Sequence, residues 1–181
     1  MSDVLDRYRQ LADDYQSRLE SVSAAAWDNQ SPCDEWKARD VASHVNGIAR
    51  TFLARLDDSE PPADESTDIV GTWRAARADV EAALADPERA SKVVQSPFGP
   101  MPYEMFVGRI QSVDMLVHTW DLSRAAGLDD TINADAAGHA LAGLTPFDGM
   151  IRGPGMFKEK ITPPADADIQ TQLLCFLGRE V

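Results

Sequence analysis

The residues best placed to do chemistry together are a carboxylate and an imidazole four positions apart, Asp114 and His118. A helix turns once in about 3.6 residues, so two side chains at this spacing point in nearly the same direction. An aspartate and a histidine on one side of a helix supply half of a divalent-metal site. The spacing therefore predicts a metal site on this segment, with its remaining ligands supplied by another part of the chain.

Few residues can supply those remaining ligands, because the chain has only three histidines. His44 lies in VASHVNGIARTFLARL, where apolar residues recur at helical spacing, and it falls on the flank of their face. Two antiparallel helices packed by such faces would bring His44 opposite Asp114 and His118. The alternative is that both histidines are hydrogen-bonded core residues, which is the commoner case beside an apolar face. The third, His139, lies among small residues and is interpreted as a bystander.

The elements that must position these side chains are predicted to be helices. Apolar residues at steps of three and four indicate helices over residues 3–22, 38–57, 67–85, 103–126 and 134–144, and a short one in the final IQTQLLCFLGRE. Gly127 stands at a helix-stop position, and residues 91–102 are too rich in proline to be helical, with a short extended piece at 92–95. The pattern predicts an all-α protein, a four-helix bundle with extra short helices and an irregular C-terminal segment, forming one domain over residues 1–181.

The composition bears on partners and compartment. Thirty acidic residues against 17 basic ones give a net charge of −13, which disfavours nucleic acid or an anionic membrane as a partner. No apolar run approaches the roughly 20 residues of a membrane span, and MSDVLDRYRQ lacks the pattern of a secretory signal. Two cysteines make no disulfide framework, so a cytoplasmic, reducing location is expected. Neither Cys33 nor Cys175 has a histidine at local spacing, and both are expected to be buried and unreactive.

Three segments together resemble a known family: SPCDEWKARDVASHVNGIARTF, DMLVHTWDLSRAAG and LLCFLGRE, in this order. They resemble DinB-like proteins, and most closely the mycothiol-dependent maleylpyruvate isomerase, N-terminal-domain type. The resemblance implies a DinB-like four-helix bundle that binds one divalent metal ion, zinc or nickel, through three residues. The matching positions here are His44, Asp114 and His118. Asp114 stands where the isomerases have Glu, so a different site geometry is expected.

The same resemblance implies a chemistry. In the family the metal takes the thiolate of a low-molecular-weight thiol, so we expect a thiol-dependent S-transferase or isomerase with mycothiol as co-substrate and a small electrophile. Asp121 would orient a ligand histidine, the alternative being an exposed carboxylate near the helix end. Arg109 and Arg152 would attract an anionic thiol or acid, the alternative being ordinary surface arginines. Trp36 and Trp120 are interpreted as core packing and not as substrate platforms.

Two other classes of function stay open at this point. One is a non-catalytic metal- or ligand-binding bundle, which would sequester its ligand without turning it over. The other is a metal-free bundle that serves only self-association. Bundles of this kind commonly pair, and an acidic surface does not forbid an apolar contact patch, so a homodimer is compatible with all three interpretations.

Overall fold

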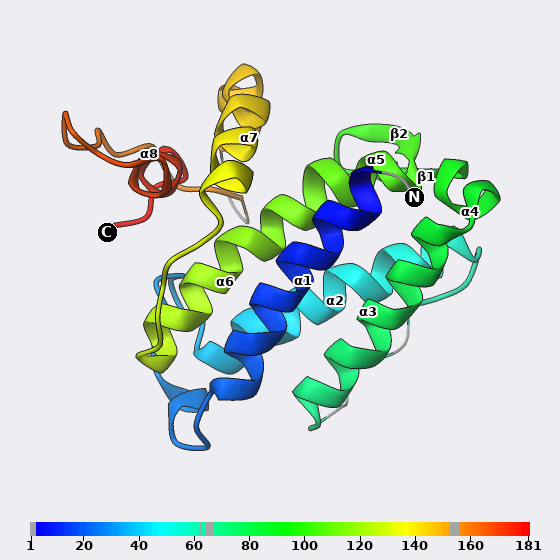
Figure 1. The fold of residues 1–181 in the computed structure, drawn as a ribbon, viewed down its shortest axis with the longest axis horizontal. Helices are drawn as coiled ribbons and strands as arrows, with labels where there is room; N and C mark the ends of the chain where they lie inside the picture. The colour runs from blue at the N-terminus through cyan, green and yellow to red at the C-terminus, as the bar shows by residue number, and fades with distance from the viewer. Residues whose placement is uncertain (1–2, 62, 64–66, 153–155) are drawn as a thin grey trace. The chain divides into compact units, whose positions relative to one another are not determined.

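The computed structural model describes residues 3–61, 63, 67–152 and 156–181, and the all-α prediction is confirmed (Figure 1). The chain groups into two compact units, Met1–Asp129 and Asp130–Val181, and each is described by itself. The prediction of a single domain over the whole chain stays a prediction.

Four long helices form the bundle of the first unit: α1 (Asp3–Ser21), α2 (Ala38–Leu56), α3 (Ile69–Ala85) and α6 (Ser112–Ala126). Helices α1 and α2 each pack against both α3 and α6 (Figure 1). Their interior is rich in aromatic rings. Tyr15 meets Trp73 edge to face with ring centroids 4.7 Å apart, while Phe52 stacks on Phe106 at 3.5 Å. Burial of such rings adds to the hydrophobic stabilisation of the bundle.

Shorter elements connect the long helices. They are the 3₁₀ turn η1 (Ala26–Asp28), helix α4 (Pro87–Ser91), strands β1 (Val93–Ser96) and β2 (Gly99–Pro102), and helix α5 (Tyr103–Phe106). The strands pair antiparallel with Ser96 opposite Gly99, and Gly99 adopts a φ of 96° at the turn. The proline-rich stretch is therefore a hairpin, longer than the single extended piece that was predicted.

The predicted helix over residues 103–126 is helical throughout but not uniform. Between α5 and α6 runs a π-helical segment, η2 (Val107–Gln111), whose wider turn the apolar spacing does not reveal. The predicted stop is confirmed: Gly127 has a φ of 67°, and the Leu128 N–H donates to the Ser123 carbonyl at 2.9 Å.

Helix α6 is also more deeply buried than an amphipathic stripe predicts. Leu116 and Leu122, six residues and therefore about 120° apart around the helix, both lie in the interior with 3% and 0% of their surfaces exposed. The helix packs against α1, α2 and η1, so most of its circumference faces protein. Polar side chains on this helix are therefore buried, and they need hydrogen-bond partners within the protein to offset the loss of water.

The second unit contains α7 (Ala134–Leu144), the 3₁₀ segment η3 (Thr145–Met150) and α8 (Ile169–Phe176), with α7 packed against α8. The Asn133 side chain accepts a hydrogen bond from the Ala136 N–H at 2.9 Å and so caps the N-terminus of α7. The N–H groups of a helix's first turn have no partner within the helix, and the cap supplies one. Arg152, a candidate for binding an anion, is engaged within this unit. Its guanidinium donates to Asp148 at 2.6 Å and to the Phe176 carbonyl at 2.7 Å.

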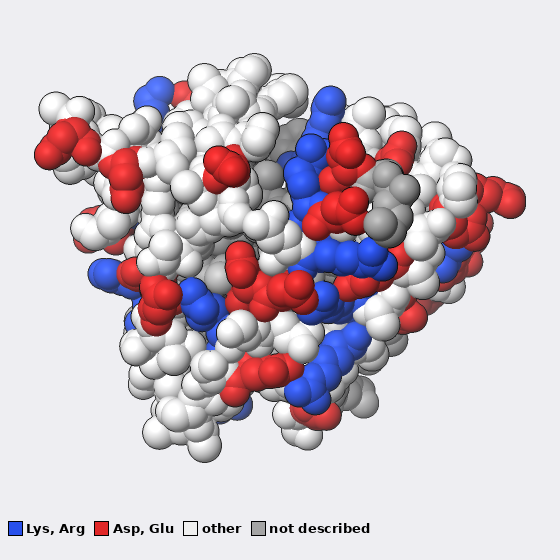
Figure 2. All heavy atoms as spheres, in the orientation of Figure 1, with Lys and Arg blue, Asp and Glu red and all other residues white. Residues whose placement is uncertain are grey.

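Charged side chains of both signs share the surface of the first unit. Figure 2 shows basic groups interleaved with acidic ones over the face that α1 and α3 form in Figure 1. Arg77 pairs with Asp13 at 2.6 Å, and Arg9 pairs with Glu81 at 2.8 Å, so part of the basic charge there is neutralised. No helix in the described part of the chain is long and apolar enough to cross a membrane.

Candidate metal centre

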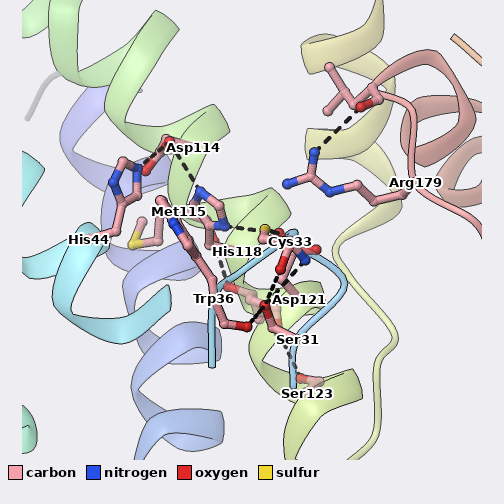
Figure 3. Close-up of polar contacts among 12 residues, drawn as sticks. Ser31, Cys33, Trp36, His44, Asp114, Met115, His118, Asp121, Ser123 and Arg179 are labelled. Carbon is pink, nitrogen blue, oxygen red and sulfur yellow. Dashed lines mark hydrogen bonds and ion pairs between the residues drawn. The ribbon is translucent and has the colours of Figure 1, made fainter. Parts of the chain in front are cut away.

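The structure brings together the three residues that the sequence singles out as metal ligands. His44 projects from α2, and Asp114 and His118 project from successive turns of α6 (Figure 3). His44 Nε2 lies 3.2 Å from Asp114 Oδ1, and His118 Nε2 lies 3.5 Å from the same oxygen. One ligand atom from each residue falls within 4.8 Å of the others. The two helices thus aim three donor atoms at one point.

This donor set fits a single divalent ion. Zinc bonds to imidazole nitrogen and carboxylate oxygen at about 2.0–2.2 Å, which places two ligands of a tetrahedral ion about 3.4 Å apart. Both nitrogen–oxygen distances lie close to that separation. Two imidazoles and one carboxylate suit zinc or nickel, and three protein ligands leave at least one coordination position open.

The orientation of His118 strengthens the case for a cation. His118 Nδ1 lies 2.9 Å from Asp121 Oδ2, where a carboxylate accepts a proton from the ring. With its proton on Nδ1, a neutral ring turns the lone pair of Nε2 toward the Asp114 carboxylate. Two electron-rich atoms repel each other at 3.5 Å unless a proton or a metal ion lies between them.

Without a metal ion, a proton on Nε2 would satisfy this requirement. Burial lowers the pKa of His118, but the charge of Asp114 and the side-chain hydrogen bonds with Asp114, Asp121 and Cys33 outweigh it and hold the pKa well above its ordinary value. Burial likewise raises the pKa of Asp114, but the charge of His118 and the hydrogen bonds from His118 and His44 outweigh it, so the pKa lies well below its usual range. Both shifts favour a positively charged His118 beside an ionised Asp114.

Asp121 lies beneath the three ligands and is fully buried, with none of its side chain exposed. The alternative of an exposed carboxylate near the helix end is therefore wrong. Its contact with His118 Nδ1 is the arrangement by which proteins fix the orientation of a ligand histidine. A buried carboxylate needs donors to offset its lost hydration, and His118 is one of them.

A second donor to Asp121 is Cys33, which the sequence analysis did not place at the site. Cys33 Sγ lies 3.3 Å from Asp121 Oδ2 and is only half-buried, so the expectation of a buried cysteine is wrong for this residue (Figure 3). Cys175, by contrast, is buried as expected.

Cys33, His118 and Asp121 also lie close enough to one another to be considered as a metal-binding group. The first set of ligands fits a tetrahedral ion better. The Asp121–His118 distance of 2.9 Å is that of a hydrogen bond and is shorter than the separation of about 3.4 Å between two ligands of a tetrahedral ion.

Trp36 contributes a wall to the site. Its indole ring lies 4.9 Å from the His44 ring and 5.8 Å from the His118 ring, measured between centroids (Figure 3). The residue is half-buried, so its interpretation as core packing is wrong. Trp120 is fully buried, and the same interpretation is confirmed for it.

The loop from Asn29 to Lys37 carries Cys33 and Trp36 to the site. Its ends are joined by an isolated bridge between Gln30 and Lys37, and the Ser31 N–H donates to the Trp36 carbonyl at 2.9 Å. Asn29 Nδ2 donates to the Ala125 carbonyl at 2.9 Å and ties the loop to the end of α6. The sequence signal that could have placed Cys33 and Trp36 at the site is their position, because SPCDEW directly precedes the helix that carries His44.

Arg109 and His139 stand apart from this cluster. Arg109 is exposed on the π-helical segment before α6, and its role in binding an anion stays a prediction. His139 lies in the second unit, where its Nδ1 is 2.8 Å from the Asp135 carbonyl of its own helix. That local contact agrees with a bystander.

Comparison with known sequences places this geometry in a family. Residues 8–123 match the family described as "Mycothiol maleylpyruvate isomerase N-terminal domain", and this range contains every residue of the cluster. Two relatives from Mycobacterium tuberculosis are each 30% identical over 99% of both chains. They are uncharacterized protein MT0763 of strain CDC 1551 / Oshkosh and uncharacterized protein Rv0738 of strain ATCC 25618 / H37Rv.

Comparison with solved structures agrees on the fold. A mycothiol-dependent maleylpyruvate isomerase is similar with a TM-score of 0.61 and 19% identity, and a histidine-to-alanine mutant of such an isomerase with a TM-score of 0.59 and 17% identity. Each match covers 84% of this chain and 73% of the other. The fold is thus the DinB-like bundle that the sequence predicts. The match over residues 8–123 shows that the chain belongs to the mycothiol maleylpyruvate isomerase N-terminal domain family.

Proposed function

We propose that this protein is a metal-dependent enzyme that uses a low-molecular-weight thiol in an S-transfer or isomerisation reaction. His44, Asp114 and His118 would hold one divalent ion, zinc or nickel. The observation that carries the proposal is the approach of two imidazole Nε2 atoms to one Asp114 oxygen at the separation expected for ligands of a single ion.

The chain's own residues have distinct parts in this proposal. Asp121 fixes the His118 ring through its Nδ1, and Trp36 covers one side of the two imidazoles. When bound, the ion would lower the pKa of a thiol that enters the open coordination position, so that its nucleophilic form is available near neutral pH. The electrophile would then approach from the side that the protein ligands leave open.

The choice of thiol rests on the family. Two similar solved structures are mycothiol-dependent maleylpyruvate isomerases, which supports mycothiol as the co-substrate. Arg109 is the proposed contact for an anionic group of the thiol or substrate, because it is exposed on the segment that runs directly into α6, the helix that carries Asp114 and His118. The proposal includes a cytoplasmic location, where thiols are kept reduced, and a homodimer.

A turnover assay tests the proposal. Protein loaded with zinc or nickel is mixed with mycothiol and a bimane electrophile that becomes fluorescent on forming a thioether. We expect a rate above the uncatalysed reaction that is lost in His118→Gln and retained in His139→Gln, which changes an exposed histidine outside the site. Binding of the thiol without consumption of any electrophile tested would instead favour a sequestering protein.

A further inference from the structure

The Cys33 thiol makes a contact that the proposed reaction does not use. Its Sγ lies 3.3 Å from Asp121 Oδ2, and the same oxygen lies 2.9 Å from His118 Nδ1 (Figure 3). Two side chains from different parts of the first unit therefore meet at one carboxylate oxygen that is fully buried. Since an ionised carboxylate only accepts hydrogen bonds, both neighbours are placed as donors.

The backbone of Cys33 is held on both sides of that contact. Its N–H donates to Ser31 Oγ at 3.2 Å, and its carbonyl accepts from Gln30 Nε2 at 3.0 Å. Ser31 Oγ in turn donates to the Trp36 carbonyl at 2.8 Å. The thiol is thus presented to Asp121 by a loop in which Gln30, Ser31 and Trp36 form hydrogen bonds around Cys33.

We infer that Cys33 is a positioning residue for His118. Its S–H group donates to Asp121 Oδ2, holds this carboxylate as the acceptor of the His118 Nδ1–H, and so aims Nε2 toward the ion. The inference rests on the proposed function, because it concerns how a proposed metal ligand is oriented. This geometry assigns Cys33 the role of a hydrogen-bond donor to Asp121.

Two substitutions separate the contribution of the S–H hydrogen-bond donor from that of the size of the side chain. Cys33→Ala removes the donor, and Cys33→Ser replaces it with a hydroxyl. We expect zinc affinity, measured by competition with a chelator, to fall about three- to tenfold in Cys33→Ala, less than the 10- to 100-fold typical of losing a direct partner of a ligand. Cys33→Ser should restore most of the affinity. Cys175→Ala is the matched control, because this cysteine is buried in the second unit.

Three results would overturn the inference. Equal affinity in wild type and Cys33→Ala would show that the donor is dispensable, and equal weakening in Cys33→Ser would show that only bulk matters. In the cobalt-loaded protein, a thiolate-to-cobalt charge-transfer band that disappears in Cys33→Ser would make Cys33 a ligand instead. We expect no such band in the wild type.

A measurement without metal keeps this inference separate from the proposed function. Hydrogen exchange of the His118 Nδ1–H, followed by ¹⁵N NMR in metal-free protein, should be faster in Cys33→Ala than in wild type and near wild type in Cys33→Ser. Unchanged exchange in Cys33→Ala would contradict the inference. A wild type that binds no metal but shows these exchange differences would remove the proposed function while retaining the positioning role.

Discussion

Both ring nitrogens of His118 face carboxylates, Asp121 through Nδ1 and Asp114 through Nε2. The contact with Asp121 is buried and has hydrogen-bond length, whereas the contact with Asp114 is longer and leads to the half-buried side of the cluster. His118 is therefore held by a carboxylate at each ring nitrogen. Its charge depends on whether its Nε2 binds a proton or a metal ion.

Replacing Asp121 by Asn tests how far the orientation of His118 depends on a charged acceptor. The amide keeps the shape of the side chain but lacks the negative charge, so the imidazole becomes a weaker ligand. We expect zinc affinity to fall by about 10- to 100-fold. The measurement is competition with a chelator, with circular dichroism to check the fold.

Asp135→Asn, on the exposed surface of α7, is the control for that substitution and should bind zinc like the wild type. Unchanged affinity in Asp121→Asn would mean that the carboxylate does not support the ligand.

The pKa shifts of His118 and Asp114 predict how the stability of the metal-free protein depends on pH, and metal binding should depend on pH in the opposite sense. The raised pKa of His118 gives stability that is present below about pH 6.5 and is lost as the pH rises through the raised value. The lowered pKa of Asp114 gives stability that is present above about pH 4 and is lost as the pH falls through the lowered value. From this pair, the metal-free protein should gain most stability between these limits.

A metal ion replaces the proton on His118, so zinc binding should strengthen as the pH rises from 6 to 8.5. Urea unfolding at both pH values, with and without zinc, measures this. We expect the gain in unfolding free energy on adding zinc to be larger at pH 8.5. An equal gain at both values would contradict the exchange of a proton for a metal ion.

At the scale of elements, the loop from Asn29 to Lys37 has a backbone that its sequence does not favour. Glu35 adopts a φ of 62°, in the left-handed region where a residue with a side chain costs about 1–2 kcal/mol. Its side chain is exposed, so a substitution loses little packing. The loop holds this conformation while it carries Cys33 and Trp36 to the metal ligands.

Glu35→Gly should therefore raise the free energy of unfolding by about 0.5–1 kcal/mol, the relief of strain less the extra chain entropy of glycine. Urea unfolding measures the change. Glu35→Val is the matched comparison and should be less stable than wild type, because a β-branched side chain is disfavoured at positive φ. Equal stabilities of the Gly and Val variants would show that this backbone carries no strain.

The same loop marks the limit of what the sequence could predict. His44, Asp114 and His118 lie on helices, where spacing and apolar periodicity fix direction, so their convergence could be predicted before any coordinates. Cys33 and Trp36 lie on a loop whose course depends on contacts such as Asn29 with the Ala125 carbonyl, 96 residues away. No local period encodes such a contact. The π-helical segment before α6 was missed for a related reason, since it changes hydrogen bonding and not the apolar pattern.

At the scale of the whole molecule, all proposed metal ligands and their partners lie within the first compact unit, Met1–Asp129. The single-domain prediction requires that this unit and Asp130–Val181 unfold together. Differential scanning calorimetry should then give one transition whose calorimetric and van't Hoff enthalpies agree. Two separate transitions would contradict the single domain.

The central claim of a three-residue metal site is tested most directly by elemental mass spectrometry on tag-free protein. Wild type is compared with His44→Ala and Asp114→Ala, with His139→Ala as a control outside the cluster. We predict about one equivalent of zinc or nickel per chain in wild type and in His139→Ala, and its loss in the other two variants. A wild type that holds no metal even after incubation with zinc or nickel, or ligand variants that retain it fully, would contradict the claim.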